Sequence, residues 1–215
     1  MKSLSVIFSI IIPTYNRNKE LQELINDLNR QTISNFEIII VDDKPDNIPI
    51  DTSSYGNVRY IKNKHNLGPS GSRNAGAKNA IGEWLVFLDD DDRFDINKLS
   101  VLKKYIVKGC NFIYHPIKWF MVNENCSYQT QPEINVNKIS FDKMLYRNQI
   151  GGTPGYSIKK DFFFELGCFN EKLRALEDYE LLLRLVLHQD FKPTYIDIPL
   201  THSFCYTTRK SVSKN

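Results

Sequence analysis

The most constraining feature of this 215-residue chain is an apolar run that ends in four consecutive aspartates. Residues 84–88 have the length of a buried strand, and residues 89–92 follow directly. Adjacent carboxylates repel one another and resist leaving water, so they need a compensating cation. Because hard oxygen ligands suit Mg²⁺ or Mn²⁺, the cluster predicts a divalent cation that also holds a phosphate compound. An acidic turn after an edge strand is the alternative.

Composition limits the class of protein. Hydrophobic residues make up 41% and charged residues 25% of the chain, values typical of one globular domain. A net charge of only +3 argues against nucleic acid as the partner, and four widely spaced cysteines argue against a zinc site or disulfide framework. No run approaches the roughly 18–20 apolar residues of a membrane helix. We expect a cytoplasmic protein, with peripheral association at the inner face of the membrane as an open possibility because the tail is weakly basic.

The first ninety residues predict a parallel α/β sheet. Dense β-branched runs indicate strands buried on both faces, and apolar residues at spacings of three and four indicate a first helix. A second, alanine-rich helix begins with proline and serine. The predicted strands are 5–12, 36–41, 58–61 and 84–88, and the predicted helices are 17–30 and 69–80. Strands that alternate with helices in this way favour a mostly parallel sheet flanked by helices.

The pattern then changes, but no linker or repeat marks a domain boundary. We expect one domain over 1–206, with a nucleotide-binding half over about 1–92, an acceptor half over about 93–206 and a tail over 207–215. The two halves are expected to share one continuous sheet. Further predicted helices are 97–108, 141–146, 160–166 and 176–188, and further predicted strands are 111–122, 127–131, 156–158 and 194–198.

Three polar clusters follow predicted strands. Residues 13–17 follow the first strand, Asp42 and Asp43 follow the second, and residues 89–92 follow the fourth. In an open α/β sheet, ligands bind beyond the carboxyl ends of the strands. The sequence therefore places these three clusters along one rim.

Four strings in this order resemble glycosyltransferase family 2, whose fold is GT-A. They are SIIIPTYNR, EIIIVDD, NLGPSGSRNAGAKNAIGEWLVFLDDDD and LEDYELLLRL, and the resemblance covers residues 5–187. Each string alone is a weak signal, whereas four in order are a strong one. The resemblance implies a Rossmann-like GT-A domain that binds a nucleotide-diphosphate sugar.

The resemblance implies a set of donor-binding residues. Pro13 and Tyr15 match a loop that packs an aromatic ring near the base, although Tyr15 could instead be a core tyrosine. Asp43 matches the carboxylate that accepts a hydrogen bond from uracil N3–H, and Asp42 is left as a structural residue. Lys44 and Pro45 follow where the family often has glycine and serine, so the loop differs here.

The same resemblance assigns the phosphate and metal positions. Arg73 contacts phosphate or orients Asp89, unless it is merely a surface arginine. Asp89, Asp90 and Asp91 match the Asp-x-Asp motif: Asp91 is the metal ligand, Asp90 belongs to the donor site, and Asp89 lies near the ribose or reaches the metal through water. Asp92 has the weakest claim.

The catalytic base implied by the resemblance is Asp178, in the pair with Glu177 that opens a predicted helix. A carboxylate there can take the proton of an attacking hydroxyl, or it can simply cap the helix. A glycine-containing loop at 151–155 matches a segment near donor sugar and acceptor, but an ordinary turn explains it equally. His202 is the candidate for a further metal ligand, and His65 and His115 are expected to be structural.

We therefore interpret the chain as an inverting glycosyltransferase that moves a hexose from a UDP-sugar to a hydroxyl of a glycan or lipid-linked saccharide, with Mn²⁺ or Mg²⁺. Two alternatives stay open. A sugar-phosphate nucleotidyltransferase would have a glycine-rich basic signature after the first strand, where residues 13–16 read PTYN. An inactive nucleotide-sugar-binding protein would not need both Asp91 and Asp178.

Overall fold

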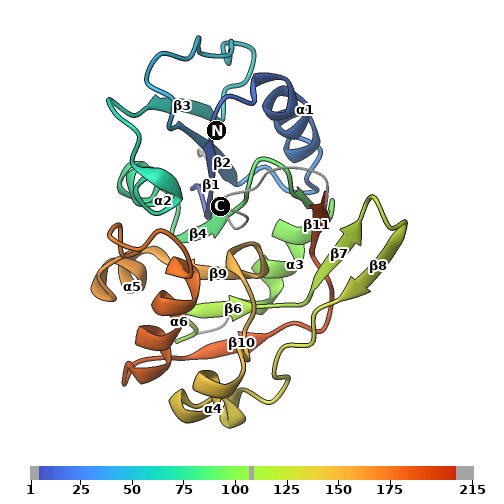
Figure 1. The fold of residues 1–215 in the computed structure, drawn as a ribbon, viewed down its shortest axis with the longest axis vertical. Coiled ribbons are helices and arrows are strands. Elements are labelled where there is room, and N and C mark those ends of the chain that lie inside the picture. Colours follow the sequence, from blue (N-terminus) through green and yellow to red (C-terminus); the bar gives the residue numbers. More distant parts are fainter. Residues whose placement is uncertain (1–4, 107–108, 207–215) are drawn as a thin grey trace.

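A seven-stranded sheet forms the centre of the computed structural model, which describes residues 5–106 and 109–206 (Figure 1). The strand order is β10-β6-β9-β4-β1-β2-β3. β9 runs antiparallel to both of its neighbours, and every other pair is parallel. The strands are β1 Phe8–Thr14, β2 Phe36–Asp42, β3 Val58–Lys62, β4 Trp84–Phe87, β6 Phe112–Tyr114, β9 Tyr156–Lys159 and β10 Pro193–Tyr195. The predicted mostly parallel α/β sheet is confirmed.

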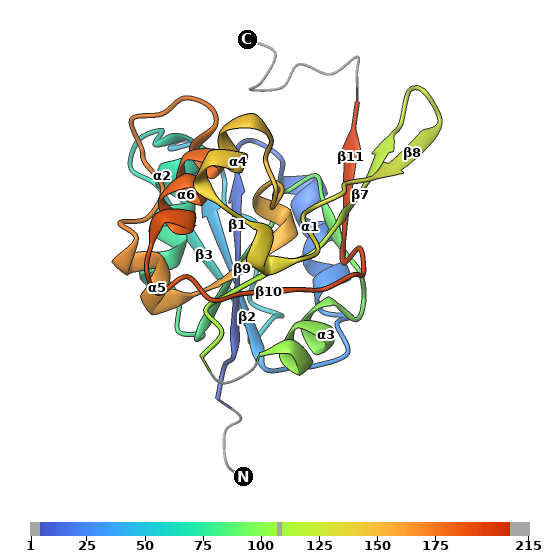
Figure 2. The same cartoon turned by 90° about the horizontal axis from the view of Figure 1, so that it is seen from below.

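Helices cover both faces of this sheet (Figure 2). Side chains alternate along a strand, so Ile10 and Ile12 pack into the core on the side of α1 and α3, while Ile11 packs into the core on the side of α2 and α6. Burial on both faces explains the unbroken apolar run of β1. The helices are α1 Asn18–Leu28, α2 Gly68–Asn79, α3 Lys98–Tyr105, α4 Phe141–Tyr146, α5 Lys160–Glu165 and α6 Glu177–Leu187.

Small residues let α2 lie close to the sheet. A Cβ atom added at Gly76 would collide with the Ile11 side chain and press on Val41. Pro69 sits in the first turn, where its missing N–H costs no helical hydrogen bond. The close approach brings the start of α2 to the carboxyl ends of β1 and β2.

The two halves of the chain share the seven-stranded sheet, as expected, because β9 of the second half pairs with β4 of the first, but a second sheet that was not predicted also forms. It has the order β5-β11-β7-β8 and stands out from the body of the molecule (Figure 2). The predicted strand 111–122 is divided at His115 and Pro116, so that β6 joins the large sheet and β7 the small one. Proline has no N–H for a ladder and restricts the residue before it, which favours the break there. The strands are β5 Arg93–Phe94, β7 Ile117–Met121, β8 Cys126–Gln129 and β11 Thr201–Cys205.

Several predicted boundaries were also wrong. The first strand begins at Phe8 rather than at residue 5 and continues to Thr14. The strand predicted over 194–198 is Pro193–Tyr195, and β5 and β11 were not predicted. Two short 3₁₀ helices, η1 Val136–Lys138 and η2 Thr153–Gly155, lie between the elements.

The division into halves near residue 92 stays a prediction. The tail 207–215 and the end of the helix predicted over 97–108 lie outside the described residues. Among the helices that the structure describes, none has the length and apolar character needed to cross a bilayer.

Candidate active site

The three polar clusters lie along one rim of the large sheet, as predicted. Thr14 at the end of β1 is in register with Asp42 at the end of β2, and β4 runs parallel to β1 on its other side. The Thr14 hydroxyl donates a hydrogen bond of 2.8 Å to Asp90 Oδ2. The residues after β1 and β4 therefore form one connected site.

The four aspartates after β4 point in different directions. Asp90 is buried and accepts hydrogen bonds from Thr14 and Arg17. Asp89 and Asp91 are more open, with side chains 40% and 35% exposed. This arrangement puts two accessible carboxylates beside a buried and oriented one.

Asp92 faces the protein interior rather than the open rim. It is buried beside Ser203 and the main chain of Phe204 in β11. Burial raises the pKa of Asp92, and the charges of Asp89 and Asp91 raise it further. The weak claim of Asp92 to a metal agrees with this placement.

Burial also perturbs Asp90. It raises the pKa of that carboxyl to about 6, although the Arg17 guanidinium and the Thr14 hydroxyl act in the opposite direction. Asp90 Oδ1 and Asp91 Oδ2 converge on the same atom, Arg17 Nη1, which lies 2.9 Å from the Asp91 oxygen. Two hard oxygens that converge on one positive centre fit Mg²⁺ or Mn²⁺, whose other ligands are usually waters and phosphate oxygens.

Arg73 joins the acidic motif to the predicted catalytic helix. Its guanidinium donates to Asp89 Oδ1 at 2.7 Å and to Glu177 Oε1 at 2.8 Å. Arg73 is only 5% exposed, so the surface-arginine alternative is wrong. Burial alone would lower the pKa of Arg73, but the Asp89 and Glu177 carboxylates outweigh it and raise that pKa. The side chain is therefore a fixed positive charge between α2, β4 and α6.

Asp178 lies in the first turn of α6, next to the glycine loop 151–155. A Cβ atom at Gly152 would be 3.5 Å from Asp178 Oδ2, so this oxygen lies directly beside a position that carries no side chain. Burial raises the pKa of Asp178, and the neighbouring Glu177 charge adds to the effect. Asp178 Oδ1 accepts a hydrogen bond of 2.7 Å from the Tyr179 N–H, one of the first N–H groups of α6, which have no partner within the helix.

A left-handed residue sets the direction in which α6 begins. Leu176, immediately before the carboxylate pair, has φ +60°, a conformation that is unfavourable for a leucine. The structure therefore holds the start of α6 in a strained turn that aims Glu177 at Arg73.

A buried lysine holds the glycine loop 151–155 in place through a hydrogen bond to its main chain. Lys98, at the start of α3, donates from Nζ to the Pro154 carbonyl at 3.0 Å and to Thr201 Oγ1 at 2.7 Å. Lys98 is fully buried, and this burial lowers its pKa. The loop beside Asp178 is thus anchored to the core, and the structure brings it to the site.

The two aspartates after β2 have different surroundings. Asp42 is completely buried and accepts from Asn47, Tyr60 and the Lys44 N–H, which confirms that it is structural.

Asp43 accepts from Asn63, the Leu67 N–H and the Gly68 N–H, each at 2.8 Å, and so holds the start of α2. Because a carboxylate has about four lone-pair positions, these three bonds do not use the whole acceptor capacity of Asp43.

Tyr15 extends outward from the turn after β1. It is 53% exposed, so the core-tyrosine alternative is wrong and its ring face is available to a planar ligand. Pro13 pairs in register with Val41 inside the sheet and supports this turn. Asn16, with φ +58°, redirects the chain into α1.

The structure does not bring His202 to the acidic motif. In β11, Thr201 bonds inward to the Pro154 carbonyl and Ser203 lies beside Asp92, so alternation directs His202 to the opposite face. There its ring meets Phe120 edge-on at 5.7 Å between centroids, and its charged neighbours are Asp95 and Lys118. The geometry gives no support to its assignment as a metal ligand.

His115 is buried, as expected for a structural residue.

Three site residues were missed by the sequence reasoning: Arg17, Lys98 and Asn63. Arg17 stands in the polar string after β1, and this position was a usable signal. Lys98 and Asn63 carried no local signal, because their partners lie 9 to 103 residues away along the chain.

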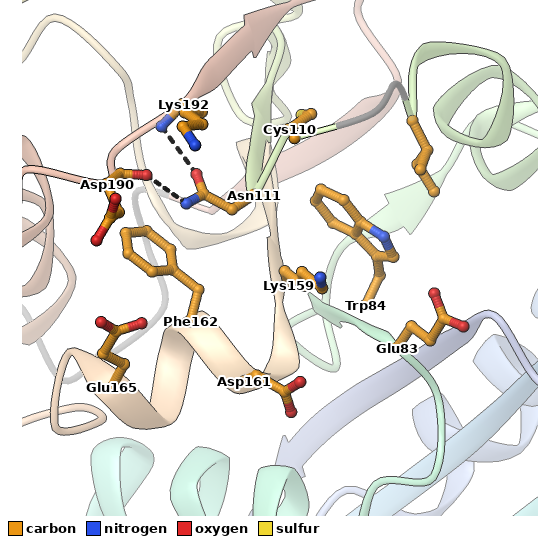
Figure 3. Close-up of a pocket in the computed structure, with 12 residues that line it drawn as sticks. Glu83, Trp84, Cys110, Asn111, Lys159, Asp161, Phe162, Glu165, Asp190 and Lys192 are labelled. Carbon is orange, nitrogen blue, oxygen red and sulfur yellow. Dashed lines mark hydrogen bonds between the residues drawn. The ribbon is translucent and has the colours of Figure 1, made fainter.

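A pocket of about 550 Å³ lies at the opposite end of the sheet, around the first residue of β4 (Figure 3). Glu165, His188 and Asp190 lie close together at this end. The His188 Nδ1 accepts from the Asp190 N–H at 3.2 Å, and its Nε2 lies 3.5 Å from Glu165 Oε1. Glu165 and Asp190 are exposed, and exposed acidic groups commonly lie together without an ion, so this group does not by itself indicate a metal site.

Comparison with known proteins identifies the family. The family model described as "Glycosyl transferase family 2" matches residues 9–165. The chain belongs to this family. It is 44% identical over 210 residues to an uncharacterized glycosyltransferase of Haemophilus influenzae, and the match covers 96% of this chain and 71% of that protein. Some other relatives are much longer, and the chain spans only 20–25% of three Rickettsia glycosyltransferases that it matches.

The name of a second relative and the description of a solved structure include a nucleotide sugar. A WfgD protein of Escherichia coli, named as a UDP-Glc:alpha-D-GlcNAc-diphosphoundecaprenol beta-1,3-glucosyltransferase, is 28% identical, with 67% of this chain and 57% of that protein covered. Staphylococcus aureus TarS, solved in complex with UDP-GlcNAc, matches with a TM-score of 0.75 at 22% identity over 97% of this chain and 61% of that one. The structural match confirms the GT-A fold.

Proposed function

We propose that this glycosyltransferase is an inverting hexosyltransferase that uses a UDP-sugar, with a divalent cation, and glycosylates a hydroxyl of a glycan or lipid-linked saccharide. The observation that carries the proposal is that Thr14 bonds Asp90, while the adjacent Asp89 shares the buried Arg73 with Glu177, the neighbour of Asp178. It joins the predicted donor site to the predicted base. The UDP-sugars and the lipid-linked acceptor in the names of its relatives support these substrate classes.

The proposed donor site uses the rim of β1, β2 and β4. Tyr15 offers a ring face to the base, Asp43 accepts from its N–H, and Arg73 keeps Asp89 oriented. Asp90 and Asp91 would hold Mg²⁺ or Mn²⁺. When bound, that cation neutralises charge on the diphosphate leaving group.

The proposed chemical step is a single displacement. Asp178 accepts the proton of the acceptor hydroxyl, whose oxygen forms a bond to the anomeric carbon of the sugar. The bond between that carbon and the diphosphate oxygen breaks, and its electron pair leaves with the nucleoside diphosphate. Gly152 leaves room for the acceptor beside Asp178 Oδ2. Attack from the face opposite the leaving group inverts the configuration.

A panel of nucleotide sugars tests the proposal. The protein is incubated with Mn²⁺, each donor and a saccharide acceptor, and released nucleotide is measured. We expect UDP release from a UDP-sugar and a product of inverted configuration by NMR. Pyrophosphate release would indicate a nucleotidyltransferase, and binding without turnover would indicate an inactive binding protein. A lipid-linked acceptor would place the enzyme at the inner face of the membrane, which vesicle flotation tests.

A further inference from the structure

Arg17 lies across the two carboxylates that would hold the cation. Its Nη1 donates to Asp90 Oδ1 and, at 2.9 Å, to Asp91 Oδ2. The Arg17 side chain is 26% exposed and leaves the main chain between the left-handed Asn16 and the first residue of α1. The guanidinium thus reaches the motif from the open side of the rim.

The neighbouring arginines have other roles. Arg73 is buried and bonded to Asp89 and Glu177. Arg93 directs Nη1 to the Asp92 carbonyl at 2.9 Å and Nε to Asp27 at 3.2 Å. In the part of the chain that the structure describes, the guanidinium that bonds both Asp90 and Asp91 is that of Arg17.

We propose that Arg17 is a resident counter-ion that competes with the divalent cation for Asp90 and Asp91. A metal ion and a guanidinium nitrogen cannot use the same carboxylate oxygens, because like charges a few ångströms apart repel strongly at a partly buried site. Thr14 bonds the other oxygen of Asp90 and keeps that carboxylate oriented after the guanidinium leaves. This inference rests on the proposed metal site at the rim.

The competition predicts that metal and nucleotide bind together rather than separately. A metal ion alone must displace Arg17 into water and gains only two carboxylates. A metal ion that arrives with a diphosphate provides new negative oxygens, to which the displaced guanidinium can donate. UDP should therefore raise the affinity for the metal in the natural chain by more than in a chain without Arg17.

Calorimetry with Mn²⁺ alone tests the competition without any sugar donor. We expect Arg17→Met to bind Mn²⁺ roughly tenfold more tightly than the natural chain, the scale expected for removing a charge-assisted hydrogen bond. Arg93→Met is the matched control, because it removes the same charge beside the motif without freeing Asp90 or Asp91. Its Mn²⁺ affinity should change by less than about twofold, as expected for screened charges.

Unchanged or weaker Mn²⁺ binding in Arg17→Met would overturn the proposal and indicate that Arg17 only orients the carboxylates. An equal gain in Arg93→Met would also overturn it, because the effect would then come from net charge. Arg17→Lys, which keeps the charge, should stay closer to the natural chain.

A measurement on the natural chain tests the proposal even if the Arg17 variants fail to fold. The Arg17 Nε–H signal should shift by NMR when Mg²⁺ and UDP are added together, and a fixed signal would contradict displacement. If UDP fails to bind while Mn²⁺ behaves as expected, the proposed function fails and the competition stands.

Discussion

The two ends of the seven-stranded sheet both carry charged side chains, but they differ in how those charges are buried and paired. At the carboxyl end, carboxylates from β4 and α6 share the buried Arg73, and those of Asp90 and Asp91 share Arg17. At the amino end, a pocket of about 550 Å³ is lined by charges of both signs, including Lys159, Asp161 and Lys192.

Asn111 at the amino end bonds to the main chain of the segment before β10. Asn111 donates to the Asp190 carbonyl and accepts from the Lys192 N–H, as Figure 3 shows. These bonds join the residue before β6 to the chain before β10, and they use the main-chain groups of Asp190 and Lys192 rather than their charged side chains. The comparison teaches that a hollow alone does not identify a site, whereas buried charges that share one partner do.

The largest expected difference between the two ends concerns stability. Arg73→Met leaves Glu177, whose side chain is only 13% exposed, without its partner and frees Asp89, and this should lower the free energy of unfolding by about 3 kcal/mol. Lys159→Met at the amino-end pocket should change it by less than about 0.5 kcal/mol, because Lys159 is exposed. Urea denaturation measures both. Equal changes in the free energy of unfolding would show that Arg73 contributes no more to stability than a surface lysine.

The next difference concerns turnover. Asp178→Asn keeps the shape of the side chain and removes the proton acceptor, so turnover should fall about 10²-fold or more while UDP binding persists. Asp190→Asn at the amino end should leave turnover unchanged. Steady-state rates and calorimetry with UDP separate the two effects. An active Asp178→Asn enzyme would assign the base to another residue.

The pH profile sharpens the role of Asp178. Burial raises its pKa, and only the ionised carboxylate accepts a proton, so kcat/KM should fall as pH decreases through a value above the ordinary aspartate range near 3.9. The dependence of kcat/KM on pH, measured with saturating metal, gives the pH at which activity falls on the acid side. If kcat/KM fell only near the ordinary aspartate pKa, or did not fall on the acid side, the result would argue against Asp178 as the base.

The smallest expected effect concerns base recognition. Asp43 should favour UDP over CDP by about tenfold to a hundredfold, because cytosine presents an acceptor at N3 to a carboxylate. Asp43 also holds the Leu67 and Gly68 N–H groups, so Asp43→Ala would disturb α2 as well as the base site. Competition among four nucleoside diphosphates on the natural chain is therefore the cleaner test. Equal affinities would refute the uracil assignment.

The sequence predicted the first half of the fold better than the second for a physical reason. Strands β1, β2 and β4 are buried on both faces, and such strands are dense apolar runs that a sequence displays directly. The small sheet has short, partly exposed strands, and β11 contains no dense apolar run. Its existence depends on pairing with β7 and β5, which no local pattern reports.

The same distinction applies to the site. The rim residues after β1, β2 and β4 could be placed together, because strand ends are determined by topology. The sequence could not predict the face of β11 on which His202 lies, because a shift of one residue in register reverses the direction of every side chain in a strand. The second contact of Arg73, with Glu177, joins residues 104 apart in the chain and needed the folded structure.

Paramagnetic broadening by Mn²⁺ with UDP tests most directly whether the donor binds at the carboxyl end of the sheet. In a ¹⁵N-labelled chain, amide signals of residues 14–17, 68–73 and 89–92 should broaden, while those of 109–111, 159–165 and 188–192 should stay sharp. Asp91→Ala should reduce the broadening. Broadening at the amino-end pocket, with sharp signals at the rim, would contradict the account.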